Sequence, residues 1–161
     1  MIFYLILFVL AIILDQITKI LTTRFFDLYE AKEIIPKILS FTYIRNEGAA
    51  FGILQGARVF FVILTIAVFI AIAIYFAKGR PQSQLEKLSL TFIAGGAAGN
   101  FIDRLFLGYV RDFIMVDFID FPVFNIADCF VCIGAGLYIL YSVMDLLKQK
   151  KEDLNHESES A

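Results

Sequence analysis

The sequence predicts an all-α membrane protein with four transmembrane helices and a small β-containing loop region outside the membrane. Hydrophobic residues make up 60% of the 161 residues, and the mean hydropathy of +0.78 is far above that of soluble domains. Long apolar stretches recur along the chain, separated by mixed segments. One of these mixed segments carries the alternation of a β-strand.

The first span is predicted to run beyond its purely apolar part. Residues 1–14 are apolar but fall short of the roughly 20 residues that cross a bilayer, so Asp15, Gln16 and Lys19 should belong to the same helix. A cleaved signal peptide is excluded by the missing basic n-region and small-x-small site. Asp15 and Lys19 stand four residues apart and should pair on one helix face. The pair is assigned to structural support, with a simple boundary salt bridge as the alternative.

Residues 22–57 have mixed composition and should leave the membrane. Within them, Ile38 to Arg45 alternates Leu39, Phe41 and Tyr43 on one face, which predicts a strand. The small-residue run from Gly48 to Gly52 follows it. Such a run lets a backbone approach a ligand closely, although the pattern alone favours an ordinary turn.

Two further spans are clear from composition, and a third depends on including polar residues. Val59 to Ala77 and Ile126 to Met144 are long and apolar. The span between them begins at Leu88 and reaches membrane length only by including Asn100, Asp103 and Arg104; its glycines and alanines favour tight helix packing. The short basic loop 78–87 favours a cytoplasmic position. Residues 1–147 form the transmembrane domain, and residues 148–161 a polar cytoplasmic tail that is predicted to be disordered.

Alternating spans bring polar residues from distant segments to one membrane boundary. The residues expected there are Asp15, Lys19, Asn46, Asn100, Asp103, Arg104, Asp112, Asn125 and Asp128. Capping of the last helix is the alternative explanation for Asn125 and Asp128. Independent caps and loop acids do not explain the convergence, and carboxylates inside a membrane protein usually mark function.

The residue types restrict the chemistry to carboxylates. The single histidine, His156, lies in the tail, so a Ser-His or Cys-His nucleophile is not expected. Cys129 and Cys132 form a lone C-x-x-C and are interpreted as small buried apolar residues, with no disulfide, metal or cofactor. Two neighbouring aspartates that share a proton can hydrolyse an amide without a covalent intermediate.

Two other function classes agree with part of the pattern. A small membrane ion or proton carrier could use intramembrane carboxylates as a relay, but relay acids should be strung across the bilayer. A structural subunit would not need clustered acids. The net charge of -2 gives no reason to expect nucleic acid.

Five sequence blocks, in order, resemble the lipoprotein signal peptidase (signal peptidase II) family. They are Asp15–Lys19, Asn46–Phe51, Gly99–Arg104, Val110–Phe113 and Phe124–Asp128. The resemblance implies an aspartic endopeptidase of the bacterial inner membrane, with its site near the extracytoplasmic face. Such an enzyme cleaves prolipoproteins before a diacylglyceryl-modified cysteine, contacts membrane lipid and is inhibited by globomycin-type cyclic peptides.

The same resemblance implies residue roles. Asp112 and Asp128 would be the catalytic pair. The residues that bind substrate or brace the site would be Asn46, Gly48, Asn100, Asp103, Arg104 and Asn125. Arg111 departs from the family, which often has an apolar residue there, and we expect its side chain to face away from the catalytic pair.

Asp117 and Asp120 are predicted to be dispensable for cleavage. Residues 112–117 fit an extended segment, in which Asp112 and Asp117 point to opposite faces. Asp120 shares the parity of Asp112, so only the V-x-D-F pattern of the family favours Asp112 over it.

Overall fold

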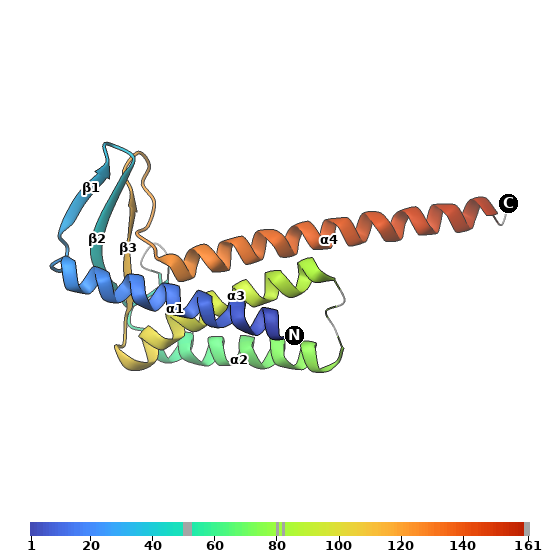
Figure 1. Ribbon diagram of the computed structural model, residues 1–161, viewed down its shortest axis with the longest axis horizontal. Helices are drawn as coiled ribbons and strands as arrows, with labels where there is room; N and C mark the ends of the chain where they lie inside the picture. The colour runs from blue at the N-terminus through green and yellow to red at the C-terminus, as the bar shows by residue number, and fades with distance from the viewer. Residues whose placement is uncertain (50–52, 80, 82, 160–161) are drawn as a thin grey trace.

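The protein consists of a helical bundle with a small sheet across one end (Figure 1). The computed structural model describes residues 1–49, 53–79, 81 and 83–159. Within these residues, the elements in chain order are α1 (Ile2–Phe25), β1 (Ala31–Ile35), β2 (Leu39–Asn46), α2 (Arg58–Ala77), α3 (Gln84–Phe106), β3 (Val110–Val116) and α4 (Ile126–Glu159). Most of the predicted small-residue run after Gly48, namely residues 50–52, lies outside the described residues.

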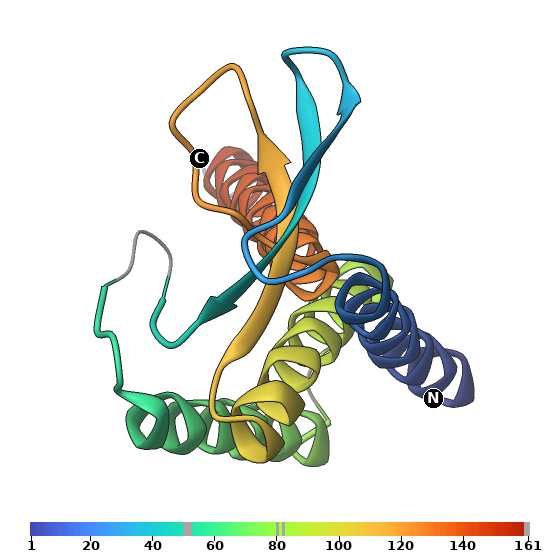
Figure 2. The same ribbon diagram turned by 90° about the vertical axis from the view of Figure 1, so that its left-hand side faces the viewer.

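Among the described residues, three helices are long and apolar enough to cross a membrane by length and composition: α1, α2 and the Ile126–Asp153 part of α4. The fourth helix, α3, lies between the other three (Figure 2) and contacts all of them as well as β3. Its buried face includes Ser89, Thr91 and Asp103, whereas α2 has no buried residue among those described. The polar groups of α3 are therefore shielded inside the bundle by apolar helices.

Small residues let α3 approach its neighbours, as the sequence predicts. A Cβ added to Gly95 would lie 2.9 Å from the Cβ of Ala11 on α1. On another face, a Cβ on Gly96 would collide with the carbonyl oxygen of Ala127 on α4. The backbones of α1 and α4 therefore both pack directly against α3.

The sheet has the order β1-β2-β3 and is antiparallel throughout. The predicted strand at 38–45 is confirmed as β2, whereas β1 was not foreseen, because its mixed residues are all exposed. Ile44 of β2 pairs with Asp112 of β3. Phe124 pairs with Ile114 at the other edge of β3, so the chain enters α4 beside the strand that carries Asp112.

The disordered tail expected after residue 147 is instead helical. Helix α4 continues without a break to Glu159 and extends far beyond the other helices (Figure 1). Residues 148–153 carry acids and bases at helical spacing, and Lys148 lies 3.8 Å from Glu152 one turn later. Charged pairs of this kind support a solvent-exposed helix.

Candidate active site

The polar residues from distant segments meet at the sheet end of the bundle. Here the middle of α1 and the second half of α3 lie against the first turn of α4, where Asp15 accepts the backbone N–H of Ala127 and Gly96 packs on the same residue (Figure 1). Asp112 lies in the middle of β3, and Asp128 lies in the first turn of α4. Both aspartates line the same cavity, which has a volume of about 400 Å³.

Asp128 is oriented by the cap of its own helix. The backbone N–H of Asp128 donates to Oδ1 of Asn125 at 3.0 Å, and the backbone N–H of Asn125 donates to Oδ2 of Asp128 at 3.1 Å. This reciprocal pair is a capping box, so Asn125 and Asp128 do cap the last helix, which is the alternative explanation that the sequence offers for them. Only one oxygen of Asp128 is used by the cap. The other accepts Nδ2 of Asn100 at 2.7 Å.

Asp112 is held by two amides and is only 2% exposed. Nδ2 of Asn46 donates to one carboxylate oxygen at 2.8 Å, and Nδ2 of Asn125 donates to the other at 2.6 Å. Burial and then the charge of Asp128 raise the pKa of Asp112 to about 7, against the smaller opposing effect of the two amide hydrogen bonds. Asp112 therefore keeps a proton at a pH where an ordinary aspartate has lost it.

Asn125 and Asn100 link the two carboxylates. Nδ2 of Asn125 donates to Oδ1 of Asn100 at 3.1 Å as well as to Asp112. The same Oδ1 of Asn100 accepts Nζ of Lys19 at 2.8 Å. The orientation of both asparagines is thus fixed, because each carbonyl oxygen already accepts a defined donor. Asp112 and Asp128 are held in one continuous hydrogen-bond network.

A buried ionic network lies behind the aspartates. Nζ of Lys19 lies 2.9 Å from Asp15 and 3.5 Å from Asp103, and Nη2 of Arg111 lies 2.7 Å from Asp103. Gln16 completes it by accepting Nη2 of Arg111 at 2.9 Å. The side chains of Asp15, Lys19 and Asp103 are completely shielded from solvent. Two carboxylates face two cations, so the buried charges balance.

This network fixes α4 relative to α1 and α3. The second oxygen of Asp15 accepts the backbone N–H of Ala127 at 2.9 Å, in the first turn of α4. Gly99 lies so close to Asp15 that an added Cβ would collide with the carboxylate. Asp15 and Lys19 thus do more than form a boundary salt bridge. They connect three helices beside the capping box of Asp128.

Arg104 and Gly48 hold the loop that borders the cavity. Nη2 of Arg104 donates to the carbonyl oxygen of Gly48 at 3.0 Å, and its guanidinium lies 4.6 Å from the ring centre of Phe61 on α2. Gly48 also donates to Oδ1 of Asn46 at 2.9 Å. A side chain at position 48 would lie 2.6 Å from the carbonyl oxygen of Ile53, so this turn requires glycine.

Some of the residues expected to bind substrate or brace the site line the larger cavity, and others lie behind it. Asn46, Asn100, Arg104, Asp112 and Asp128 line the larger cavity. Asp103 does not, because it is 1% exposed and bound by Lys19 and Arg111. Asn125 is fully buried and Gly48 contributes its backbone. All of them meet at one end of the bundle, while their roles in catalysis stay predictions.

Sequence reasoning missed two participants and misjudged the cysteines. Gln16 has no assigned role in the motif, yet it lies beside Asp15 and bonds to Asp103. Arg111 faces away from Asp112, as expected, but it also neutralises Asp103. The alternation of side chains along β3 was the signal in the sequence that places Arg111 and Asp112 on opposite faces of the strand.

Cys132 is exposed rather than buried, and both it and Cys129 line the larger cavity.

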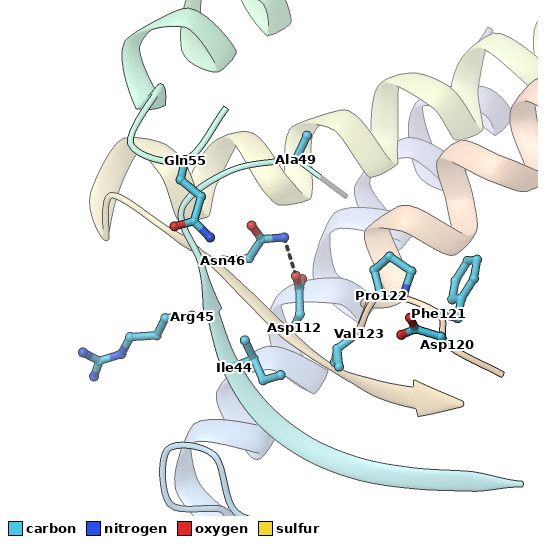
Figure 3. A pocket seen from close by; sticks show the side chains of 10 residues that line it. All are labelled: Ile44, Arg45, Asn46, Ala49, Gln55, Asp112, Asp120, Phe121, Pro122 and Val123. Atoms are coloured by element: carbon cyan, nitrogen blue, oxygen red, sulfur yellow. Dashed lines mark hydrogen bonds between the residues drawn. The ribbon is translucent and has the colours of Figure 1, made fainter. Parts of the chain in front are cut away.

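A second cavity of about 290 Å³ adjoins the first (Figure 3). The two share Asn46, Ala49, Asp112 and the segment 121–123 as lining residues. Asp120 lines only this second cavity, whereas Asp117 is exposed and accepts the hydroxyl of Ser40 at 2.8 Å. Asp120 lies beyond the end of β3, so strand parity does not govern its direction.

Comparison with known proteins shows which family the chain belongs to. A family described as Signal peptidase (SPase) II matches residues 7–144. Lipoprotein signal peptidases of Enterococcus faecalis and Halalkalibacterium halodurans are 40% and 42% identical to the chain. The first alignment covers 94% of both sequences, and the second covers 94% of this chain and 98% of the relative.

Solved structures give the same result. A bacterial membrane enzyme determined by the in meso method at 2.3 Å resolution superposes with a TM-score of 0.84 and 38% identity, over 89% of this chain and 88% of the other. Another, at 1.9 Å resolution, gives a TM-score of 0.81 and 38% identity, over 88% and 93%. The family match, the apolar helices and these structural neighbours lead to one conclusion: this chain is a bacterial membrane protein that belongs to the signal peptidase II family.

Proposed function

We propose that the protein is an intramembrane aspartic endopeptidase that removes signal peptides from diacylglyceryl-modified prolipoproteins, cutting before the lipidated cysteine. The observation that carries the proposal is the pair Asp112 and Asp128. In a chain of the signal peptidase II family, these two carboxylates line one cavity and are joined through Asn125. The other two carboxylates of the cluster, Asp15 and Asp103, form ion pairs with Lys19 and Arg111.

The reaction needs one proton between the two carboxyl groups. Asp112, with a pKa near 7, holds that proton, and Asp128 acts as the base. Asp128 removes a proton from water as the water oxygen attacks the carbonyl carbon, while Asp112 protonates the carbonyl oxygen. The C–N bond then breaks as Asp128 gives the proton it took from water to the nitrogen, which leaves as an amine. One hydroxyl of the tetrahedral intermediate returns a proton to Asp112 as the acyl side leaves as a carboxylic acid. Water is the only co-reactant.

The proposed membrane arrangement has α3 as a fourth span, in the centre of the bundle. A polar helix can cross a bilayer when its polar face is packed inside protein, and α3 is surrounded by α1, α2 and α4. With the short basic loop 78–87 and both termini in the cytoplasm, the sheet and the aspartates lie at the extracytoplasmic face of the inner membrane. A lipidated substrate would approach from the side, with its acyl chains still in the bilayer.

A carrier of ions or protons is less well supported. Its carboxylates should form a path through the bilayer, whereas Asp15, Asp103, Asp112 and Asp128 gather at the sheet end. Cyclic peptides of the globomycin type are proposed as ligands of the larger cavity, which is lined mainly by apolar side chains.

The decisive experiment is cleavage by the purified protein of one precursor in lipidated and unlipidated form. We expect release of the signal peptide from the lipidated precursor and at least about tenfold slower release from the unlipidated one, because the acyl chains hold the substrate at the membrane. Asp128→Asn at the same protein concentration is the inactive control. Absence of cleavage of either precursor by the unaltered protein would overturn the proposal.

A further inference from the structure

The smaller cavity differs from the larger one in its surroundings. The larger cavity lies against α3 and α4 and is walled by apolar side chains such as Val110, Phe124 and Val131. The smaller one lies on the strand and loop side, outside the helices, and includes Gln55 and Asp120 (Figure 3). Asp112 borders both. A polypeptide crossing Asp112 would therefore have one side in an apolar chamber and the other in a chamber lined by polar and apolar side chains in similar number.

The side chains that line the two chambers indicate which part of a bound polypeptide each chamber would hold. The signal peptide is the apolar part that lies among the helices, so it fits the larger cavity. The mature part of the polypeptide leaves toward water and fits the smaller cavity. This assignment rests on the function proposed above, because it requires Asp112 to be at the cleaved bond.

Asp120 determines the charge of the smaller cavity. Among the described residues, the other charged side chains that line it are Asp112 and Arg45. The guanidinium of Arg45 points away from the cavity (Figure 3), since its Nε donates to the hydroxyl of Tyr43 at 3.2 Å and it lies 4.9 Å from the ring centre of Tyr109. Asp112 is needed for the reaction and is bound by two asparagines. The carboxylate of Asp120, in contrast, is exposed and turned toward the cavity.

We propose that the smaller cavity holds the first residues of the mature lipoprotein after the lipidated cysteine, and that Asp120 selects for basic and against acidic residues there. Asp120 touches neither the water nor the cleaved bond in this arrangement, so it determines specificity and not the chemistry. Asp117, which lies three residues earlier and bonds to Ser40, has no such role. The sequence predicted that both aspartates are dispensable for cleavage, whereas the structure places only Asp120 at the smaller cavity.

The effect should be modest, because Asp120 is exposed to solvent. Exposed ion pairs contribute less than about 1 kcal/mol, which corresponds to a preference of about threefold to fivefold. The preference should weaken as salt is added, since screening acts strongly on exposed charges.

The test uses three lipidated precursors with the same signal peptide and cysteine, followed by Lys-Lys, Ser-Ser or Glu-Glu. For the unaltered protein, we expect kcat/KM to be about threefold higher for Lys-Lys than for Glu-Glu, mainly through KM. Asp120→Asn should bring this ratio close to one, and Asp120→Lys should invert it. Asp117→Asn and Asp117→Lys are matched controls and should keep the original ratio.

Each outcome bears on one proposal. If the unaltered protein cleaves none of the three precursors, the proposed peptidase function fails. If it cleaves all three without regard to charge, or if the ratio survives Asp120→Lys, only the role of Asp120 is overturned. Loss of all cleavage by Asp120→Asn, in a protein with an unchanged thermal unfolding midpoint, would also overturn it, because Asp120 would then belong to the catalytic machinery.

Discussion

Two groups of aspartates lie side by side in this protein, and they differ in what surrounds their charge. Asp103 and Asp112 are almost equally buried, at 1% and 2% exposure. Asp103 is bound by the cations of Lys19 and Arg111. Asp112 is bound by neutral amides and faces a second carboxylate in a cavity. Burial by itself therefore does not determine the protonation of a carboxyl group. Among the described residues, Asp112 has no cation in ion-pair contact, and burial raises its pKa to about 7.

The same comparison explains why both groups occur together. The asparagines that orient Asp112 and Asp128 need fixed positions, and Asn100 obtains its position from Lys19. In the proposed mechanism, the charge-balanced network provides rigidity, and the neighbouring pair Asp112 and Asp128 exchanges the proton. Four predictions test this division of roles, from the largest expected effect to the smallest.

The first prediction removes proton exchange in the reactive pair. Asp112→Asn or Asp128→Asn should each reduce kcat at least about 1,000-fold, and the double change should be scarcely worse, as for residues that act as a unit. Release of signal peptide is measured at matched protein levels. Asp117→Asn is the control and should cleave a neutral substrate at a near-normal rate. Near-normal cleavage by Asp112→Asn would refute the assignment.

The second prediction breaks the balanced network. Lys19→Met leaves Asp15 and Asp103 with one cation between them and should lower the free energy of unfolding by about 3 to 5 kcal/mol. Adding Asp15→Asn should recover part of this loss, because it removes the uncompensated charge.

Thermal unfolding in detergent measures these differences. Lys148→Met is the matched control. Its partner Glu152 is exposed, so the change should cost less than about 0.5 kcal/mol. An effect of Lys19→Met as small as that of the control would contradict a structural role for the network.

The third prediction disturbs the geometry of the network without changing charge. Gly99→Ala places a Cβ against the carboxylate of Asp15, which cannot move because it is bound by Lys19 and the backbone of Ala127. A loss of about 1 to 3 kcal/mol is expected from such overpacking. Gly136→Ala, where an added Cβ meets nothing within 4 Å, should instead leave stability unchanged or raise it by up to about 1 kcal/mol.

The fourth prediction concerns pH. Asp112, with a pKa near 7, loses its proton as the pH rises above that value, and the pair then lacks the shared proton that the reaction needs. We therefore expect kcat/KM to fall above about pH 7, approaching tenfold per pH unit. The profile is measured between pH 6 and 9 with the neutral precursor. A constant rate up to pH 9 would show that Asp112 does not supply the proton.

The sequence by itself determined the features that follow from local pattern. Nineteen uncharged residues from Val59 to Ala77 are sufficient to specify a helix of membrane length. Alternation over 38–45 specified a strand, and the spacing of Asn125 and Asp128 specified a helix cap. The alternating directions of the helices then brought the aspartates to one end. Each of these inferences depends on residues close in sequence, or on the order of the elements.

Only the tertiary structure decided which buried charges are balanced. Gln16 and Arg111 are 95 residues apart, and their contact depends on how β3 lies across α1 and α3. Asp117 and Asp120 are both predicted to be dispensable, but the carboxylate of Asp117 accepts the hydroxyl of Ser40, whereas Asp120 lines a cavity. Electrostatic environment depends on neighbours in space at distances of a few ångströms, and no local pattern contains that information.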